Sequence, residues 1–377
     1  MGQLKVMTIV GTRPEVIKLS RVIAELEKQT DHVLVHTGQN YDFELNEVFF
    51  KDLELRAPDY FLGVNAESVA ERIGLTIARV DEILGQEIPD AVLFYGDTNS
   101  CLAAISAKRR QIPVFHMEAG NRCFDERIPE EINRRIIDHI SDINMPLTEH
   151  ARRHLLREGI RPETIIKTGS TMSEVLAHYH SAIDRSDILK RLGIEPRRYF
   201  LVSAHREENV DDEGNFKDLL ASLEEVQTEF KIPIIFSTHP RTRLRLQRLC
   251  PNPQTNGIQF LKPLGFLDYV KLQTQACCVL SDSGTITEEA SLLNLPAITI
   301  RQTHERPEGM DEGILIMSGL KPKRVVQAIH VVVSQFERDD YEPGRVCDYD
   351  GGRVSKKVVR IIYSYVDYVN RTVYGRP

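Results

Sequence analysis

Residues 5–28 read KVMTIVGTRPEVIKLSRVIAELEK, and this stretch indicates how the chain folds. The apolar run Lys5–Val10 has the length and composition of a buried strand. Gly11 permits a tight turn after it, and Pro14 stands in a first-turn position, where helices accept proline. The pattern therefore predicts a strand that leads directly into a helix over Pro14–Lys28.

The same alternation continues through the first half of the chain. Strands are predicted at His32–His36, Ala91–Tyr95, Val114–Met117 and Ile143–Met145, with a helix at Ser68–Leu84. Strand–helix–strand units at this spacing favour right-handed crossovers between parallel strands. The first half therefore predicts a parallel sheet with helices packed on it.

The alternation resumes after a polar, charged segment around residues 182–198. The strands predicted in this half are Tyr199–Ser203, Pro233–Ser237, Ile258–Leu261, Cys278–Leu280 and Ala297–Ile300. The predicted helices are Asn215–Phe230, Phe266–Gln275, Ile286–Leu293 and Lys323–Phe336. We predict an α/β protein of two doubly wound domains, residues 1–182 and 183–354, with a cleft between them. The tail 354–373 has a helical pattern.

Composition excludes some classes of protein. Of the 377 residues, 41% are hydrophobic and 27% are charged, as in an ordinary globular enzyme or binding protein. The net charge of -7 provides no global basic field for nucleic acid, and basic pairs such as Arg134-Arg135 are expected on solvated helix faces. None of the six cysteines forms a CxxC motif, so a metal cluster or a disulfide framework is not expected.

The chain is expected to be a cytoplasmic protein. The start MGQLKVMTIVGTRPE lacks the pattern of a signal peptide, because Gly11 and a charged loop interrupt its apolar run. No window approaches the roughly 20 apolar residues of a membrane helix. The absence of a disulfide-like cysteine pattern also favours a reducing compartment.

Ligands of doubly wound sheets bind beyond the carboxyl ends of the strands, so the residues that follow each strand are site candidates. After the first strand, Arg13 and the helix N-terminus can bind an anion, although an ordinary turn is an equal alternative. Asp97 follows the strand at 91–95. It is either a catalytic carboxylate or the cap of the next helix, and the cap is the commoner role.

Three further residues stand at strand or helix ends. Glu118 follows a buried strand, where a carboxylate is poorly placed for a solvated face and suits proton transfer. Glu130 follows Pro129 in what also looks like an ordinary helix start. His205 heads a charged loop, so a functional role competes with simple packing.

Residues 281–289 read SDSGTITEE, and residues 301–309 read RQTHERPEG. Ser283 and Gly284 begin a helix whose free N–H groups can cradle a phosphate, and a glutamate one turn in can accept two ribose hydroxyls. The alternative is a capped helix with first-turn acids. The second loop ends the next strand and would face the same cleft.

Short motifs occupy these strand ends in a defined order: GTRPE (11–15), TGQ (37–39), GDT (96–98), HMEAG (116–120), PEEINRR (129–135), AHREEN (204–209), HPR (239–241), DSG (282–284), EEA (288–290) and ERPEG (305–309). Together they resemble the non-hydrolysing UDP-N-acetylglucosamine 2-epimerase family. The resemblance implies a GT-B fold of two Rossmann-like domains, a last helix (about 355–377) that packs back on the first domain, and a homodimer.

The resemblance also implies a reaction. UDP is eliminated across C1–C2 of an N-acetylhexosamine to give a 2-acetamidoglycal, and is added back while C2 is protonated on the other face, without NAD or a metal. It implies Asp97, Glu118 and Glu130 as catalytic carboxylates, assisted by His205. The residues it implies for UDP are Arg13, His205, Ser283, Gly284, Glu289, Arg301 and Arg306, with Glu305 in the same cleft.

The chain departs from the family pattern in places. TGQ continues with Asn40, where members activated by their own substrate commonly have His-Arg, and Glu207 replaces a commoner arginine. KVMTIVGTRPE (5–15), TGQNYD (37–42) and NEVFFKDL (46–53) look most like the subgroup that makes UDP-N-acetyl-L-fucosamine from UDP-2-acetamido-2,6-dideoxy-L-talose for surface polysaccharide.

Other functions stay open at this point. The substrate can instead be UDP-N-acetylglucosamine or a diacetamido-glucuronate. A GT-B glycosyltransferase, a hydrolysing relative and a catalytically silent nucleotide-sugar sensor are further alternatives, because fold does not settle function. The set Asp97, Glu118 and Glu130 favours an epimerase, since a transferase needs no carboxylates on both faces of C2.

Overall fold

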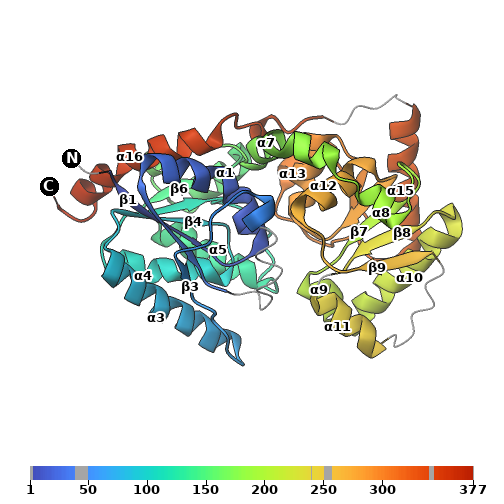
Figure 1. Ribbon diagram of the computed structural model, residues 1–377, viewed down its shortest axis with the longest axis horizontal. Helices are drawn as coiled ribbons and strands as arrows, with labels where there is room; N and C mark the ends of the chain where they lie inside the picture. The colour runs from blue at the N-terminus through green and yellow to red at the C-terminus, as the bar shows by residue number, and fades with distance from the viewer. Residues whose placement is uncertain (1–2, 39–49, 239, 250–256, 339–343, 377) are drawn as a thin grey trace. The chain divides into compact units, whose positions relative to one another are not determined.

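The computed structural model describes residues 3–38, 50–238, 240–249, 257–338 and 344–376 (Figure 1). The chain divides into two compact units. The first unit comprises residues 1–178 together with 348–377, and the second comprises residues 179–347.

The first unit is built on a six-stranded parallel sheet in the order β3-β2-β1-β4-β5-β6. Its strands are β1 (Lys5–Val10), β2 (Asp31–His36), β3 (Tyr60–Phe61), β4 (Ala91–Tyr95), β5 (Val114–Met117) and β6 (Ile143–Met145). Its helices are α1 (Arg13–Gln29), α3 (Val69–Glu87), α4 (Ala104–Arg109), α5 (Pro129–Ile140), α6 (Glu149–Arg157) and α16 (Val354–Thr372), and α7 (Met172–Arg185) runs across the boundary between the units.

The second unit has its own six-stranded parallel sheet, in the order β12-β11-β10-β7-β8-β9. Its strands are β7 (Phe200–Ser203), β8 (Ile234–Ser237), β9 (Ile258–Leu261), β10 (Cys278–Ser281), β11 (Ala297–Thr299) and β12 (Ile316–Met317). Its helices are α8 (Ile188–Leu192), α9 (Glu207–Val210), α10 (Glu213–Phe230), α11 (Pro240–Leu249), α12 (Phe266–Gln275), α13 (Thr285–Leu293), α14 (Pro307–Asp311) and α15 (Pro322–Arg338).

Both sheets follow one doubly wound strand order, which confirms the predicted α/β class. When the strands of each unit are numbered 1 to 6 along the chain, the first sheet has the order 3-2-1-4-5-6. The second sheet has the order 6-5-4-1-2-3, which is the same order listed from the opposite edge. The order reverses between the first and fourth strands, which are β1 and β4 in one unit and β7 and β10 in the other. Such a reversal is where doubly wound sheets bind ligands, so the loops after these four strands define the expected sites.

The predicted strands agree with the observed ones to within a residue at each end, and two strands were missed. The missed strands are β3 and β12, each two residues long and at one edge of its sheet. A two-residue strand is too short to show any periodicity.

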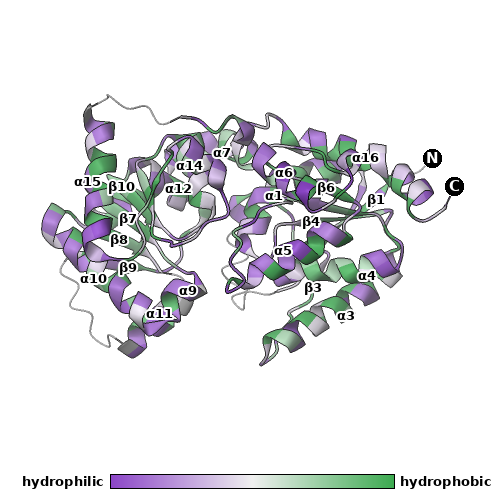
Figure 2. Cartoon of the chain, turned by 180° about the vertical axis from the view of Figure 1, so that it is seen from behind, coloured by the Kyte–Doolittle hydropathy of each residue, from purple (hydrophilic) through white to green (hydrophobic). Residues whose placement is uncertain are grey.

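The tail helix α16 packs on α1, and the two lie together on one face of the first sheet, with α3 and α4 on the other (Figure 1). The hydroxyl of Tyr363 in α16 donates to the carbonyl of Gln29 at 2.6 Å. Apolar and polar residues alternate along α16 in Figure 2, and its buried side includes Val358, Ile362 and Val366. The apolar stripe of α16 therefore completes the core of the first unit.

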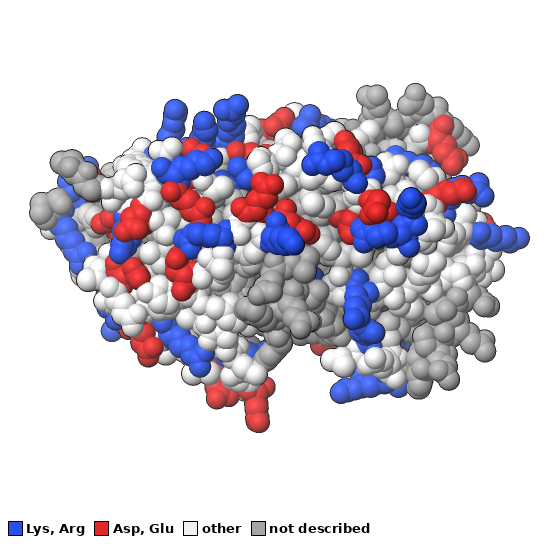
Figure 3. Space-filling view, viewed as in Figure 1, with Lys and Arg blue, Asp and Glu red and all other residues white. Residues whose placement is uncertain are grey.

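Charges of both signs are interspersed on the face seen in Figure 3, in keeping with the modest net charge of -7. Among the described residues, no helix is long and apolar enough to cross a membrane.

Candidate functional site

The carboxylate of Glu15 joins the two loops at the strand-order reversal of the first sheet. One of its oxygens accepts the backbone N–H groups of Gly11 (2.6 Å) and Thr12 (2.8 Å), and the other accepts the Thr98 hydroxyl at 2.6 Å. Burial raises the pKa of Glu15 to about 7, against the opposing effect of these hydrogen bonds. The turn after β1 is thus tied to the turn after β4.

Arg13 opens helix α1 directly after this turn and is half-buried. The turn itself leaves no room at Gly11, where a Cβ atom would lie 1.9 Å from Oγ of Ser100 and 2.4 Å from Oγ1 of Thr37. Those two hydroxyls are hydrogen-bonded to each other at 2.8 Å. The glycine is therefore required by close packing.

Asp97 is held by an arginine and does not cap the next helix. Its Oδ2 accepts Nε (3.0 Å) and Nη2 (2.7 Å) of Arg134. The cap of the following 3₁₀-helix is Thr98, whose hydroxyl accepts the N–H of Ser100 at 3.3 Å. The expectation that Asp97 acts as the cap was wrong, and so was the expectation that Arg134 lies on a solvated face, since it is 3% exposed.

Glu118 follows β5 in a left-handed conformation, with φ of +63°. Its Oε2 forms an ion pair with Lys18 of helix α1 and accepts the hydroxyl of Tyr95 at 2.9 Å. A Cβ on Gly96 would lie 3.7 Å from its other oxygen, so this carboxylate lies against the residue that precedes Asp97. Lys18 and Tyr95 were not predicted, because a lysine in helix α1 and a tyrosine in a strand carry no local signal.

Glu130 and Glu131 are neighbours in the first turn of α5 and have different surroundings. Glu131 is fully buried, where it accepts the N–H of Cys123 at 3.1 Å and pairs with Arg134 at 2.8 Å. Glu130 is half-buried. It stands four residues before Arg134, on the same face of the helix. Glu131 is therefore structural, and Glu130 is the more accessible carboxylate.

A buried carboxylate also joins the two loops at the strand-order reversal of the second sheet. Asp282, after β10, accepts the backbone N–H of His205 at 3.0 Å on both oxygens, the N–H of Arg206 at 3.0 Å and Nδ2 of Asn209 at 3.1 Å. Nδ1 of His205 lies 3.3 Å from Oδ1 of Asp282. The loop of His205 is thereby anchored to the start of the DSG turn.

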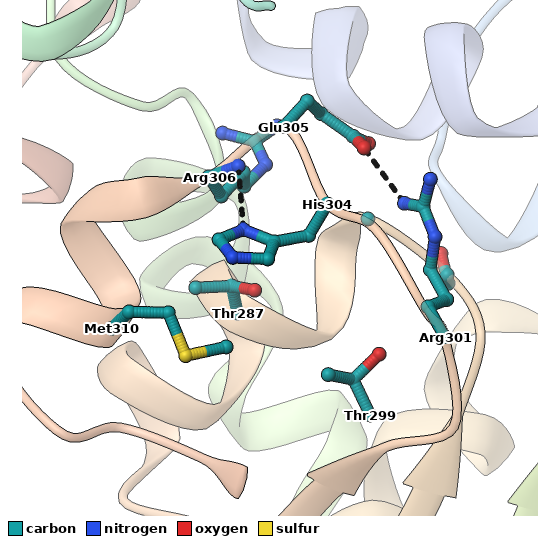
Figure 4. Close-up of a pocket in the computed structure, with 9 residues that line it drawn as sticks. Thr287, Thr299, Arg301, His304, Glu305, Arg306 and Met310 are labelled. Atoms are coloured by element: carbon teal, nitrogen blue, oxygen red, sulfur yellow. Dashed lines mark hydrogen bonds and ion pairs between the residues drawn. The ribbon is translucent and has the colours of Figure 1, made fainter. Parts of the chain in front are cut away.

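Next to Asp282 lies a pocket that contains four of the predicted UDP-binding residues (Figure 4). It is lined by Ser283, Gly284, Thr287, Thr299, Arg301, His304, Glu305, Arg306 and Met310. These residues come from the start of α13 and from the stretch between the end of β11 and α14, so both stretches meet there.

Arg301 and Arg306 are buried cations of this pocket. Nη1 of Arg301 donates to Glu305 at 2.7 Å, as Figure 4 shows, while its Nε and Nη2 have no hydrogen-bond partner among the described residues. Arg306 pairs with the fully buried Glu288 at 2.5 Å. A Cβ at Gly284 would lie 2.3 Å from Oε1 of Glu305, so a larger residue there would force this carboxylate to move.

Glu289 lies outside the lining of this pocket. Its Oε2 accepts Nε2 of Gln273 at 2.5 Å, and Gln273 is fully buried. This contact orients the Glu289 carboxylate. The amide of Gln273 gave no signal in the sequence.

The predicted site residues thus divide between the two units. Arg13, Asp97 and Glu118 directly follow strands of the first sheet or begin the next helix, and Glu130 lies in the first turn of α5. The second unit contains His205, Ser283, Gly284, Glu289, Arg301 and Arg306. The departure at Asn40, the end of the TGQ motif and His239 lie outside the described residues. Within the described ranges, no group of three or more His, Cys, Asp or Glu residues is placed to hold a metal ion.

The fold and the residues at the strand ends define an α/β protein of the doubly wound class. The sequence model of the family described as UDP-N-acetylglucosamine 2-epimerase matches residues 24–363. The chain belongs to this family of isomerases.

Individual relatives are similar over nearly their whole length. A UDP-N-acetylglucosamine 2-epimerase of Methanocaldococcus jannaschii is 35% identical, with 95% of this chain and 99% of the relative covered. A UDP-2,3-diacetamido-2,3-dideoxy-D-glucuronate 2-epimerase of Pseudomonas aeruginosa is 32% identical, with 95% and 99% covered. The solved structure of a UDP-N-acetylglucosamine 2-epimerase from Rickettsia bellii is 58% identical, covers 99% of this chain and 100% of its own, and has a TM-score of 0.93. The likeness to solved structures of this family confirms the predicted GT-B fold class.

Proposed function

We propose that this chain inverts C2 of a UDP-linked 2-acetamido sugar by eliminating UDP and adding it back. The observation that carries the proposal is the Glu118 carboxylate, held by Lys18 and Tyr95 against the turn of Asp97. C2 of such a sugar is weakly acidic, so proton transfer there needs positioned acid–base groups. Carboxylates supported by cations are suited to that task.

In the first half-reaction, a carboxylate of the first unit takes the C2 proton while the C1–O bond breaks and its electron pair leaves with UDP. Glu118 and Glu130 are the proposed acid–base pair, and Asp97, fixed by Arg134, supports one of them. In the second half-reaction, C2 is protonated on the opposite face as UDP returns to C1.

The second unit is proposed to hold UDP. Ser283 and Gly284 directly precede helix α13, whose N-terminal N–H groups suit a phosphate. Nε and Nη2 of Arg301 lack a hydrogen bond among the described residues, although Nη2 lies 3.9 Å from Glu208, and suit the anionic diphosphate. His205 assists the departure of UDP, and Glu289, oriented by Gln273, accepts the ribose hydroxyls. Arg13 of the first unit and Arg306 complete the proposed set. A homodimer and a cytoplasmic location stay predictions.

The sugar we propose is UDP-2-acetamido-2,6-dideoxy-L-talose, which gives UDP-N-acetyl-L-fucosamine. This choice rests on the resemblance of residues 5–15, 37–42 and 46–53 to that subgroup. UDP-N-acetylglucosamine is the second candidate, because the Rickettsia bellii structure bears that name at 58% identity.

Proton NMR in deuterated water tests both substrates. The purified chain is incubated with each UDP-sugar, and deuterium at C2 with inverted configuration is expected for the L-talose compound. Exchange only in UDP-N-acetylglucosamine would replace the proposed sugar and keep the reaction. No exchange in either would reject both sugars and favour the diacetamido-glucuronate or a glycosyl transfer. A Glu118→Gln variant with full turnover would overturn the acid–base assignment.

A further inference from the structure

The side chain of His116, in strand β5, lies between two hydrogen-bond acceptors. Its Nδ1 is 2.9 Å from Oδ1 of Asp138, and its Nε2 is 2.9 Å from the carbonyl oxygen of Gly96. The ring is 1% exposed, so it is shielded from bulk water. A neutral imidazole carries one N–H and can satisfy one acceptor, whereas an imidazolium carries two.

The proton shared with Asp138 can in principle reside on either side chain, and the other partners of Asp138 decide between them. Its second oxygen accepts the N–H of Gly120 at 3.1 Å and Nη1 of Arg122 at 2.7 Å. Burial acts to raise the pKa of Asp138, but the hydrogen bond from His116 and the charge of Arg122 hold it below its ordinary value. Two donors on this second oxygen, one of them a cation, favour the carboxylate form of Asp138, so the proton shared with His116 resides on the ring.

Charge balance leads to the same assignment. Arg122 uses its other edge to bind Glu158 of helix α6, through Nε at 2.8 Å and Nη2 at 2.5 Å. With a protonated His116, this cluster holds two cations and two anions. With a neutral ring these four groups would carry one excess negative charge beside His116, Asp138 and Arg122, which are almost fully buried; Glu158 is 27% exposed and also contacts His139 at 3.3 Å. An unpaired buried charge is strongly unfavourable.

The cluster holds the two turns that carry the proposed acid–base groups. Gly96, whose carbonyl oxygen lies 2.9 Å from Nε2 of His116, directly precedes Asp97, and Glu118 stands two residues after His116. Both Gly96 (φ of +70°) and Glu118 (φ of +63°) have left-handed backbone conformations. For a glutamate such a conformation is disfavoured and needs support from its surroundings.

Helix α5 organises these contacts along one face. Glu130, Arg134 and Asp138 follow one another at intervals of four residues, so their side chains share a side of the helix. Arg134 binds Asp97, and Asp138 binds His116. The helix that offers Glu130 therefore also sets the positions of the turns with the other two carboxylates.

We propose that His116 is a buried imidazolium that positions the turns of Asp97 and Glu118 and takes no part in proton transfer itself. The role of these two carboxylates rests on the proposed function, whereas the protonation of His116 does not. The charged and titratable groups around it are Asp138 of α5, Arg122 of the following loop and, behind Arg122, Glu158 at the end of α6, which His139 of α5 also contacts.

The protonation state is tested by NMR of the full chain with ¹⁵N-labelled histidine at pH 8.5. An ordinary histidine is neutral at this pH, so the remaining signals of the 12 histidines provide the internal reference. The signal absent from the His116→Gln variant is expected to show a proton on both ring nitrogens. In Asp138→Asn that signature should be lost. A singly protonated ring in the wild-type chain would overturn the proposal, whether or not the enzyme epimerises either sugar.

The positioning role is tested by kinetics on folded variants. His116→Gln is expected to lower kcat about 10²-fold, because a small displacement of acid–base groups has an effect of that order, while KM stays near the wild-type value. His139→Gln is the matched control: His139 lies next to Asp138 in α5 and contacts the same Glu158 at 3.3 Å, but its side chain is 50% exposed. Unchanged kcat in a folded His116→Gln variant would reject the positioning role.

Discussion

Asp282 accepts the backbone N–H of His205 on both of its carboxylate oxygens, each at 3.0 Å, although 77 residues separate the two in sequence. Glu15 makes the equivalent connection in the first unit, where it joins Gly11 and Thr12 to Thr98. In both units a buried carboxylate links the two loops at which the strand order reverses. The geometry of each proposed half-site therefore depends on a residue that need not touch the substrate.

Asp282→Ala should lower both stability and UDP affinity. The N–H groups of His205 and Arg206 and the amide of Asn209 lose their acceptor, and each buried unsatisfied donor costs about 1–3 kcal/mol. Chemical denaturation and titration calorimetry with UDP measure the two effects. Asp218→Asn is the control, because Asp218 forms a surface pair with the 75% exposed Lys321, and such pairs contribute at most about 1 kcal/mol. Wild-type UDP affinity in folded Asp282→Ala would show that this link does not shape the UDP site.

Lys18→Met should abolish most of the proton transfer at C2. The substitution keeps the length of the side chain and removes the cation paired with Glu118, so C2 exchange is expected to slow by about 10²- to 10⁴-fold. Deuterium incorporation from deuterated water measures this step. Lys28 is an exposed residue of the same helix, so the Lys28→Met variant should exchange the C2 proton at the wild-type rate. Equal exchange in Lys18→Met and wild type would remove Lys18 from the mechanism.

Glu15 should make the protein less stable as pH rises from about 4.5 to about 7. Its pKa is about 7 in the folded chain and 4.5 in the reference state, so in this window the folded state retains a proton that the unfolded chain has released. The free energy of unfolding then falls with rising pH, by about 3 kcal/mol across the window. Denaturation of wild type and Glu15→Gln at several pH values isolates this contribution, because the other titrating groups are shared. If the free energies of unfolding of wild type and Glu15→Gln differ by the same amount at every pH, the raised pKa of Glu15 is contradicted.

Two glycine-to-alanine substitutions should differ in outcome: one should impair UDP binding, and the other should increase stability. At Gly284 the new Cβ would lie 2.3 Å from Oε1 of Glu305, which Arg301 holds in place, so UDP binding should be lost. At Gly74, inside helix α3, nothing lies within 4 Å, and alanine should stabilise the protein by up to about 1 kcal/mol. Calorimetry and thermal denaturation test the pair. Tight UDP binding by Gly284→Ala would mean that Glu305 moves freely.

The elements of the fold could be predicted because their signals are local. The run Lys5–Val10 and the turn at Gly11 show strand and helix within a few residues, and the observed bounds agree closely. The strand-end rule then located the loops of Asp97, Glu118, His205 and Ser283 without knowledge of which strands are neighbours. The edge strands β3 and β12 could not be predicted, because two residues show no period.

The partners of the site residues could not be predicted for a different reason. Lys18 and Glu118 are 100 residues apart, and Arg134 lies 37 residues from Asp97. No local pattern records such pairs, since they depend on how helices pack on the finished sheet. The basic pair Arg134-Arg135 shows the consequence: its composition suggested a solvated face, while one of its two side chains is buried against Asp97.

The position of α16 affects the order in which the protein can be completed during synthesis. Residues 1–178 leave the ribosome first, yet the apolar surface of α1 that α16 covers stays exposed until residues 354–372 have been translated. The second unit is contained in one continuous segment and has no such dependence. Until α16 is synthesised, the apolar surface of α1 in the nascent first unit is therefore accessible to chaperones and to aggregation.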